Sequence, residues 1–311
     1  MQKIVITGAL GHIGSQLIRE MPFLLFNPEI IMFDNFLTQR YCSLFDLPED
    51  GRYKFYEADI LKDALEKYIT GADALIHLAA ITDAASSFEN PEKVEEVNYI
   101  GTKKVAKQCA KLGVPLIFLS TTSVYGSQSE LVDESCPEEE LKPQSPYAES
   151  KLKAEKLLHK MGIEDTLKYV ILRFGTIFGK SIGMRFHTAV NKFIWQASLR
   201  VPITVWKTAY EQKRPYLDLH DAVRALCHVI DNKIFPNDVF NVVTINSTVK
   251  EIVEQIKTFV PDLQVNFVES RIMNQLSYNV ASDKFTATGF SYSGSLGIAV
   301  EESVRLLRKV R

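Results

Sequence analysis

The sequence predicts an α/β fold in which a doubly wound parallel sheet is joined to a smaller α/β lobe. Apolar strand patterns alternate with helix patterns through the first 175 residues, an alternation typical of βαβ units with helices on both faces of a parallel sheet. A glycine-rich turn separates the first strand pattern from the first helix pattern. After Gly175 the alternation weakens, and loops that carry arginines separate short elements. These observations favour one large nucleotide-binding domain and a second lobe that is discontinuous in sequence.

Each expected strand is a short apolar run that ends at a turn or a polar residue. In chain order these runs are 3–6, 29–34, 54–59, 74–79, 115–120 and 169–173. Helices are expected between them, where apolar residues recur at helical spacing. The helical segments are 13–21, 61–69, 91–112 and 147–161.

The bulk composition limits the partners and the location of the protein. There are 36 Lys and Arg residues against 38 Asp and Glu residues, so there is no electrostatic signature of nucleic-acid binding. No apolar run approaches the roughly 20 residues that span a bilayer. The 4 cysteines form no C-x-x-C pair and no His/Cys cluster. We therefore expect a cytoplasmic protein with free thiols, no metal site and no membrane partner.

The turn after the first strand reads Thr7-Gly8-Ala9-Leu10-Gly11-His12-Ile13-Gly14. This G-x-x-G-x-x-G spacing lets the backbone approach a pyrophosphate and directs the start of the first helix at its negative charge. Asp34 ends the second strand, 20 residues after Gly14, where an acid accepts hydrogen bonds from the adenosine ribose and repels a 2′-phosphate. We therefore expect NAD rather than NADP. The predicted domains are a Rossmann-type NAD-binding domain at 1–175, to which about 214–245 return, and a mainly substrate-binding lobe at 176–311.

Tyr147 and Lys151 stand four residues apart in a predicted helix, and Thr121 precedes the tyrosine by 26 residues. Side chains four apart share one face of a helix. The ammonium of Lys151 can stabilise a phenolate and so lower a tyrosine pKa that starts near about 10. Such a phenolate takes a hydroxyl proton while a hydride leaves the same carbon. The pair therefore predicts a hydride-transfer enzyme.

Further motifs follow in a recognisable order. The set is TGALGHIG (7–14), Asp34, Asp59, HLAA (77–80), Asn98, STTSVYG (120–126), YAESK (147–151), RFGTIFG (173–179), RPYLDLHD (214–221) and SDKFTATGF (282–290). In this order and spacing they resemble the extended short-chain dehydrogenase/reductase family, in its nucleotide-sugar epimerase/dehydratase branch. The resemblance covers nearly all of the chain.

The resemblance implies a role for individual residues. Tyr147 is the acid or base on the sugar hydroxyl, Lys151 holds the nicotinamide ribose, and Thr121 hydrogen-bonds the reacting hydroxyl. Arg214 and Arg271 meet the diphosphate of a sugar nucleotide, because guanidinium groups match phosphate oxygens. The residues expected to bind NAD are Gly8, Gly11, His12, Ile13, Gly14, Asp34, Asn35, Asp59, Ile60, Leu78, Ala79, Ala80, Asn98, Tyr147 and Lys151.

The chain departs from the family pattern near the expected substrate. Dehydratases of this branch follow the threonine with an Asp-Glu pair, because eliminating water from a 4-keto sugar needs an acid and a base. Here Thr122 and Ser123 take those positions, and Ser123 also replaces a cysteine that is common in enzymes that epimerise next to the keto carbon. Thr176 replaces an asparagine that contacts the phosphates. We take Arg185 and Asn191 as candidates for a different substrate contact.

The predicted function is that of an NAD-dependent nucleotide-sugar epimerase, which transfers hydride at sugar C4 through a 4-keto intermediate. The alternative is a 4-dehydrogenase or 4-ketoreductase without epimerisation, and a dehydratase or a non-catalytic NAD-binding sensor is less favoured. The substrate is expected to be a UDP- or GDP-linked sugar. The helices at 91–112 and 147–161 resemble those of the family's dimer contact, which implies a homodimer.

Overall fold

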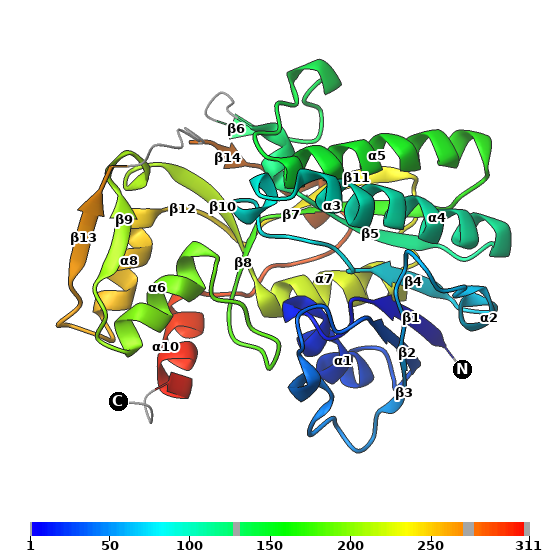
Figure 1. Cartoon of the computed structure of the whole chain (residues 1–311), viewed down its shortest axis with the longest axis horizontal. Coiled ribbons are helices and arrows are strands. Elements are labelled where there is room, and N and C mark those ends of the chain that lie inside the picture. The colour runs from blue at the N-terminus through cyan, green and yellow to red at the C-terminus, as the bar shows by residue number, and fades with distance from the viewer. Residues whose placement is uncertain (1, 127–130, 270–276, 308–311) are drawn as a thin grey trace.

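The computed structural model describes residues 2–126, 131–269 and 277–307, and a large parallel sheet dominates it (Figure 1). Its seven strands run in the order β11-β7-β5-β4-β1-β2-β3, and all neighbours pair in parallel. The chain winds outward from β1 in both directions, which confirms the predicted doubly wound sheet. The strands are β1 (Lys3–Thr7), β2 (Glu29–Asp34), β3 (Arg52–Glu57), β4 (Ala74–His77), β5 (Leu116–Thr121), β7 (Tyr169–Phe174) and β11 (Asp238–Val242).

Helices cover both faces of this sheet. Alternate residues of β1 belong to two different apolar cores, one on each face, because successive side chains of a strand point in opposite directions. One core is closed by α1 (His12–Leu24) and α7 (Leu219–Asp231), which contact each other. The other is closed by α4 (Gly101–Leu112) and α5 (Pro146–Glu164).

The long helix expected over 91–112 contains one wider turn. α3 (Pro91–Glu95) continues through the π-helical turn η3 (Glu96–Ile100) into α4. Asn98 lies at the centre of this turn and is fully buried. Such turns are frequent at functional sites.

The helix expected over 61–69 shortens to α2 (Glu66–Ile69). Asp59 explains the difference, because its Oδ1 accepts a hydrogen bond from the Leu61 amide (2.9 Å) and its own amide donates to the Asp63 carboxylate (2.7 Å). These local bonds hold the start of the segment in a turn that competes with the helix.

The second lobe begins at β8, and Figure 1 draws most of it on the left. β8 (Thr176–Phe178) pairs in parallel with β10 (Lys213–Asp218), which pairs antiparallel with β12 (Ile245–Thr248). These strands share an apolar core with three helices, α6 (Ala189–Ser198), α8 (Val249–Lys257) and α10 (Leu296–Leu307). The remaining elements are β6 (Leu131–Val132), β9 (Ile203–Trp206), β13 (Val265–Val268), β14 (Asn279–Val280), α9 (Asp283–Thr286), η1 (Tyr41–Leu44), η2 (Ser86–Phe88), η4 (Thr122–Tyr125), η5 (Glu138–Glu140) and η6 (Lys207–Ala209).

The chain passes between the two lobes several times. β10 and β12 belong to the second lobe, whereas α7 and β11, which lie between them in sequence, belong to the large sheet. The carboxyl ends of β1, β4 and β5 lie side by side in that sheet, and open parallel sheets bind ligands at this edge. Within the described ranges, no helix is both long enough and apolar enough to cross a membrane.

Candidate active site

The glycine loop packs so closely against the chain around it that two of its glycines have no room for a side chain. Gly8 has a φ of 69°, and a Cβ added there would lie 2.6 Å from the Ala79 amide nitrogen. A Cβ added to Gly14 would lie 2.5 Å from the Ala9 carbonyl oxygen. Gly11 stands at the N-cap of α1, so the free amides of the first helical turn begin here. The loop therefore presents backbone donors to an anion at close range.

Asp34 lies at the end of β2 and is tied to this loop. Its carboxylate accepts hydrogen bonds from the amides of Leu10 (3.1 Å) and Phe36 (3.0 Å). Burial raises the pKa of Asp34, while these amides and the nearby Arg40 oppose the rise. Asn35, the next residue, is exposed. The carboxylate thus stands where it can also accept hydrogen bonds from ribose hydroxyls.

The other residues expected at the cofactor follow the carboxyl ends of β3 and β4. Asp59 is engaged by the turn described above, and Ile60 is buried against Gly101. Leu78, Ala79 and Ala80 are half-buried. Ile13 is partly buried against the core on the α1 face.

Asn98 joins three parts of the site. Its Oδ1 accepts a hydrogen bond from the Ile81 amide (2.8 Å), and its Nδ2 donates to the Ile81 carbonyl (2.9 Å) and to Ser150 Oγ (3.0 Å). The loop after β4, the π-helical turn and α5 are thereby held together. Asn98 therefore acts by positioning the site in this structure.

Tyr147 and Thr121 come together from two different elements. Thr121 is the last residue of β5 and is buried, and Tyr147 lies in the first turn of α5. The Thr121 hydroxyl lies close enough to Tyr147 to lower the pKa of its phenol. Ser145 caps α5 by accepting a hydrogen bond from the Ala148 amide (3.2 Å), and Pro146 occupies the first helical position. The cap fixes where α5 begins and thus where the tyrosine stands.

The charge that acts on Tyr147 comes from an arginine rather than from Lys151. Burial raises the pKa of Tyr147, while the Arg185 guanidinium and the hydrogen bond with Thr121 lower it. Lys151 Nζ instead donates to a backbone carbonyl of β5 (2.8 Å), and burial lowers the pKa of Lys151 to about 7. The expected effect of Lys151 on the tyrosine pKa is therefore not seen in this structure, because the ammonium is bonded to β5.

A buried ion pair beside Lys151 was not expected from the sequence. Arg173 and Glu155 are 6% and 2% exposed, and Arg173 Nη2 lies 2.6 Å from Glu155 Oε2. Ser120 Oγ donates to the same carboxylate. Burial lowers the pKa of Arg173, but the Glu155 carboxylate outweighs this effect and the pKa is raised. The sequence places Glu155 four residues after Lys151 on the same helix face, but this spacing does not indicate its pairing with Arg173.

The residues that follow Thr121 carry hydroxyl groups. Thr122 is buried, and its Oγ1 donates to the Phe174 carbonyl (3.4 Å). Ser123 is half-buried, and its amide donates to Thr121 Oγ1 (3.1 Å). Thr176 is half-buried at the start of β8. No second acid or base stands at these positions.

Arg185 and Asn191 lie in the segment that follows β8. Asn191 is fully buried, with its Oδ1 accepting from the Gly179 amide (3.3 Å) and its Nδ2 donating to the Arg185 carbonyl (3.1 Å). Asn191 therefore positions Arg185, and the substrate contact expected for Asn191 stays a prediction. Burial lowers the pKa of Arg185, while Tyr147 has the opposite effect.

Arg214 approaches from the second lobe. It is half-buried on β10, and its Nη2 donates to Gln212 Oε1 (3.3 Å). Burial raises the pKa of Tyr278 to about 12, and the charge of Arg214 opposes this rise. The Tyr278 hydroxyl donates to the Thr122 carbonyl (3.0 Å), so Arg214 lies on the second-lobe side of the hydroxyl residues. Arg271, the other arginine expected at the diphosphate, lies outside the described residues.

The segment after β8 also lies directly on the glycine loop. His12 Nε2 and the Gly179 carbonyl oxygen are 2.9 Å apart, and the Gly183 amide donates to Ser15 Oγ (3.0 Å). A Cβ added to Gly183 would lie 2.6 Å from the Leu10 carbonyl oxygen. Burial lowers the pKa of His12 to about 3. His12 thus ties the lobes together, and no local pattern in the sequence indicates this contact.

His77 is a packed residue in the core. It is buried, and its ring nitrogens lie 2.7 Å from Thr7 Oγ1 and 3.1 Å from Thr102 Oγ1. Burial lowers its pKa to about 3. Among the residues that the structure describes, no three His, Cys, Asp or Glu side chains are grouped so that they could hold a metal ion.

The glycine loop, its helix and Asp34 together fit a dinucleotide. A family model described as the NAD dependent epimerase/dehydratase family matches residues 4–242. The chain belongs to this family. Its cofactor is accordingly NAD, and the residues placed around the glycine loop are those that would hold it.

Relatives of the chain include both epimerases and dehydratases. A Bacillus subtilis protein named as an uncharacterized UDP-glucose epimerase is 30% identical over 241 residues, which cover 73% of this chain and 72% of the relative. A dTDP-D-glucose 4,6-dehydratase of Dictyostelium discoideum is 32% identical over 196 residues, which cover 58% of this chain and 44% of the relative. The solved UDP-glucuronic acid 4-epimerase of Bacillus cereus, in complex with UDP-glucuronic acid and NAD, has a TM-score of 0.90 at 24% identity and covers 100% of both chains. This last likeness shows a shared fold.

The protein is thus an enzyme of the epimerase/dehydratase family. Family membership alone leaves the reaction type open, because its relatives include epimerases, dehydratases and decarboxylases. The choice of reaction type therefore depends on the residues around Tyr147.

Proposed function

We propose that the protein is a 4-epimerase for a UDP-linked sugar. The observation that carries the proposal is that Thr121 acts on Tyr147 and that the next two residues, Thr122 and Ser123, carry hydroxyls in place of carboxylates. One acid–base group is sufficient to move a proton to and from a single carbinol, whereas dehydration needs a further acid and base. The UDP-sugar epimerases among the relatives support this choice and the nucleotide.

The side chains have distinct roles in this proposal. Tyr147 takes the proton from the C4 hydroxyl, which Thr121 orients. A bound NAD would supply the hydride chemistry at C4, as acceptor in the oxidation and as donor in the reduction that follows. The reaction needs the ionised phenol of Tyr147. Burial raises the pKa of Tyr147 and opposes this ionisation, whereas the positive charge of Arg185 lowers the pKa and favours it. Lys151 holds the nicotinamide ribose, and Arg214 binds the diphosphate.

The replacement Tyr147→Phe tests the proposal. It removes the hydroxyl that accepts the proton and keeps the ring, so epimerisation should fall by about 10² or more. NAD-loaded protein is incubated with UDP-glucose or UDP-glucuronic acid, and the configuration at C4 is followed by NMR. Tyr68→Phe serves as the control, because Tyr68 belongs to α2 and packs against Phe33 in the core. Epimerisation by Tyr147→Phe at the wild-type rate would refute the role of the tyrosine.

The same experiment separates the alternative reaction. A 4-dehydrogenase releases the keto sugar, so one equivalent of NADH accumulates and the reaction stops. A 4-epimerase shows no net change in NADH while the C4 configuration changes. Accumulated NADH without an epimeric product would therefore assign the alternative.

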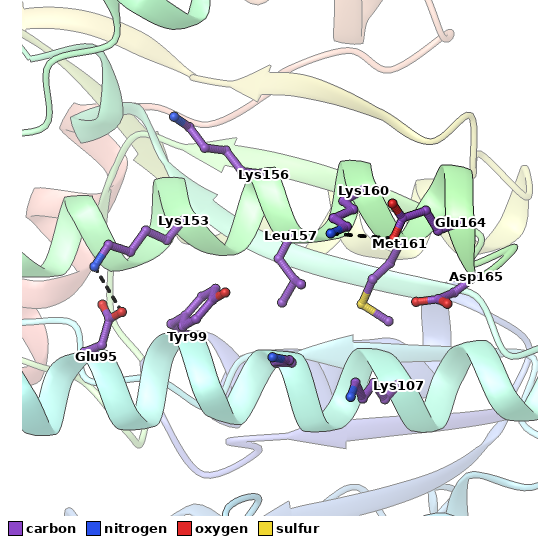
Figure 2. A pocket seen from close by; sticks show the side chains of 11 residues that line it. Glu95, Tyr99, Lys107, Lys153, Lys156, Leu157, Lys160, Met161, Glu164 and Asp165 are labelled. Atoms are coloured by element: carbon purple, nitrogen blue, oxygen red, sulfur yellow. Dashed lines mark hydrogen bonds and ion pairs between the residues drawn. The ribbon is translucent and has the colours of Figure 1, made fainter.

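We also propose that the enzyme is a cytoplasmic homodimer that pairs through α3, α4 and α5. Figure 2 shows a groove between these helices. Tyr99, Leu157 and Met161 form the apolar part of its lining, and charged side chains line the rest. Glu95 and Lys153 form an ion pair across the groove (3.0 Å). No described residue of the glycine loop lines the groove, so it is separate from the candidate active site.

A further inference from the structure

We propose that His12 is a positioning residue that couples the cofactor loop to the segment 179–191, which runs from β8 into α6. The main chain of His12 begins α1 within the glycine loop, and its side chain holds this segment. The segment carries Arg185 and Asn191, the residues expected to contact the substrate. The inference goes beyond the proposed reaction and does not depend on which sugar is bound.

The main chain of His12 lies where the cofactor is expected. His12 is the first residue of α1, directly after the N-cap Gly11. The amides of a first helical turn have no partner within the helix and bind anions. A pyrophosphate bound at the glycine loop would therefore fix the main chain from which the His12 side chain projects.

The side chain of His12 reaches out of the loop to the segment. It is 4% exposed, and its Nε2 lies 2.9 Å from the Gly179 carbonyl oxygen. A carbonyl oxygen only accepts hydrogen bonds, so Nε2 carries the proton and donates. Burial lowers the pKa of His12 to about 3, so the ring is neutral at neutral pH. One neutral donor therefore holds the start of the segment.

Ser15 provides a second link from the same helical turn. Ser15 is fully buried, and its hydroxyl donates to the His12 carbonyl (3.2 Å) and accepts from the Gly183 amide (3.0 Å). A Cβ added to Gly183 would lie 2.6 and 2.7 Å from the carbonyl oxygens of Leu10 and Gly11. The segment thus packs on the backbone of the loop, and a movement of the loop must displace it.

The hydrogen bonds continue from Gly179 to the residues expected at the substrate. The Gly179 amide donates to Asn191 Oδ1 (3.3 Å), and Asn191 Nδ2 donates to the Arg185 carbonyl (3.1 Å). Asn191 is fully buried, so a break in this series would leave buried polar groups without partners. The position of the Arg185 main chain therefore depends on the position of His12.

Two effects follow from this series of bonds. A cofactor that fixes the loop also orders the segment 179–191. The docked segment in turn raises the affinity for the cofactor, because a coupling free energy between two sites acts equally in both directions.

Two measurements on the full-length protein test the coupling. Hydrogen exchange followed by mass spectrometry reports the order of the segment 179–191 in NAD-loaded protein, and a chase of NADH-loaded protein with excess NAD reports cofactor release through NADH fluorescence. His12→Phe keeps a ring without a donor, whereas His12→Gln keeps an amide donor. We expect His12→Phe to speed both exchange and NADH release by roughly 3- to 10-fold, and His12→Gln to lie within about twofold of the wild type.

A variant at the far end of the series separates coupling from local damage to the loop. Asn191→Ala removes the bonds that hold the segment to α6 and leaves His12 in place, and it should also speed NADH release. The control is His159→Phe, which removes a histidine contact of 2.6 Å with the Tyr169 hydroxyl at the opposite edge of the sheet. This control should leave NADH release unchanged.

Faster NADH release in His12→Phe but not in Asn191→Ala would assign His12 to the loop alone and overturn the coupling. Equal behaviour of His12→Phe and His12→Gln would show that the shape of the ring matters rather than its hydrogen bond, and would contradict the proposal as well. Ser15→Ala, which removes the second link, replaces His12→Phe if that variant does not fold. Both measurements are made without a sugar, so a failure of the proposed epimerisation would leave their outcome unaffected.

Discussion

Replacing Glu155 with Gln should destabilise the protein by roughly 3–5 kcal/mol, the usual loss when a buried ion pair loses one partner. The pair is almost fully enclosed, at 6% and 2% exposure, and is bidentate, with Arg173 Nη2 and Nε at 2.6 and 3.1–3.2 Å from the carboxylate oxygens. The introduced amide would keep the shape of the side chain and leave the guanidinium buried without a counter-charge. Urea unfolding followed by circular dichroism measures the change.

A matched control isolates the effect of burial. Glu138 pairs with Lys156 of the same helix α5 at the same 2.6 Å, but these side chains are 65% and 48% exposed. Glu138→Gln should therefore change the free energy of unfolding by less than about 1 kcal/mol. If Glu155→Gln is no more destabilising than Glu138→Gln, the reasoning from burial is refuted. Removal of the Glu155 carboxylate should also lower the pKa of Lys151 further, because that carboxylate opposes the effect of burial.

Two further predictions concern acid stability and assembly. The pKa of His77 in the folded protein is about 3, below its ordinary 6.5. As the pH falls, His77 of the unfolded chain therefore binds a proton before His77 of the folded protein does. The contribution of neutral His77 to stability is complete above pH 6.5 and is lost as the pH falls toward 3. His77→Gln should make the urea midpoint depend less on pH in this window, and an unchanged slope would contradict the assignment. Leu157→Glu places a charge in the groove of Figure 2 and should convert the proposed dimer to a monomer in sedimentation velocity; a wild-type monomer would exclude that interface.

The sequence was sufficient to predict features that depend on neighbouring residues or on known motifs. The parallel sheet follows from apolar runs that alternate with helices, and the glycine loop follows from spacing alone. Thr121 and Tyr147 were each predicted as site residues, because each belongs to a motif with a family counterpart, and the structure brings them near one another. In these cases neighbours in sequence or known motifs carry the information.

The sequence was insufficient to predict features that depend on contacts between residues far apart in the chain. Gly183 contacts Ser15 of α1, which lies 168 residues earlier in the chain, and no periodicity marks such a pair. The π-helical turn at Asn98 is specified by bonds to Ile81 and Ser150 rather than by helix propensity, so the segment was predicted as one regular helix. The charge beside Tyr147 was assigned to Lys151, because helix spacing does not reveal where a long side chain ends.

The order in which the large sheet is completed has a consequence for synthesis of the protein. The core on the α1 face includes α7, β11 and finally Phe285 and Phe290. A nascent chain that has emerged only as far as β7 has every strand of the sheet except β11, but it has only α1 on this face and lacks α7. The apolar face closes only when nearly all of the chain has left the ribosome, so the two lobes are completed together rather than one after the other.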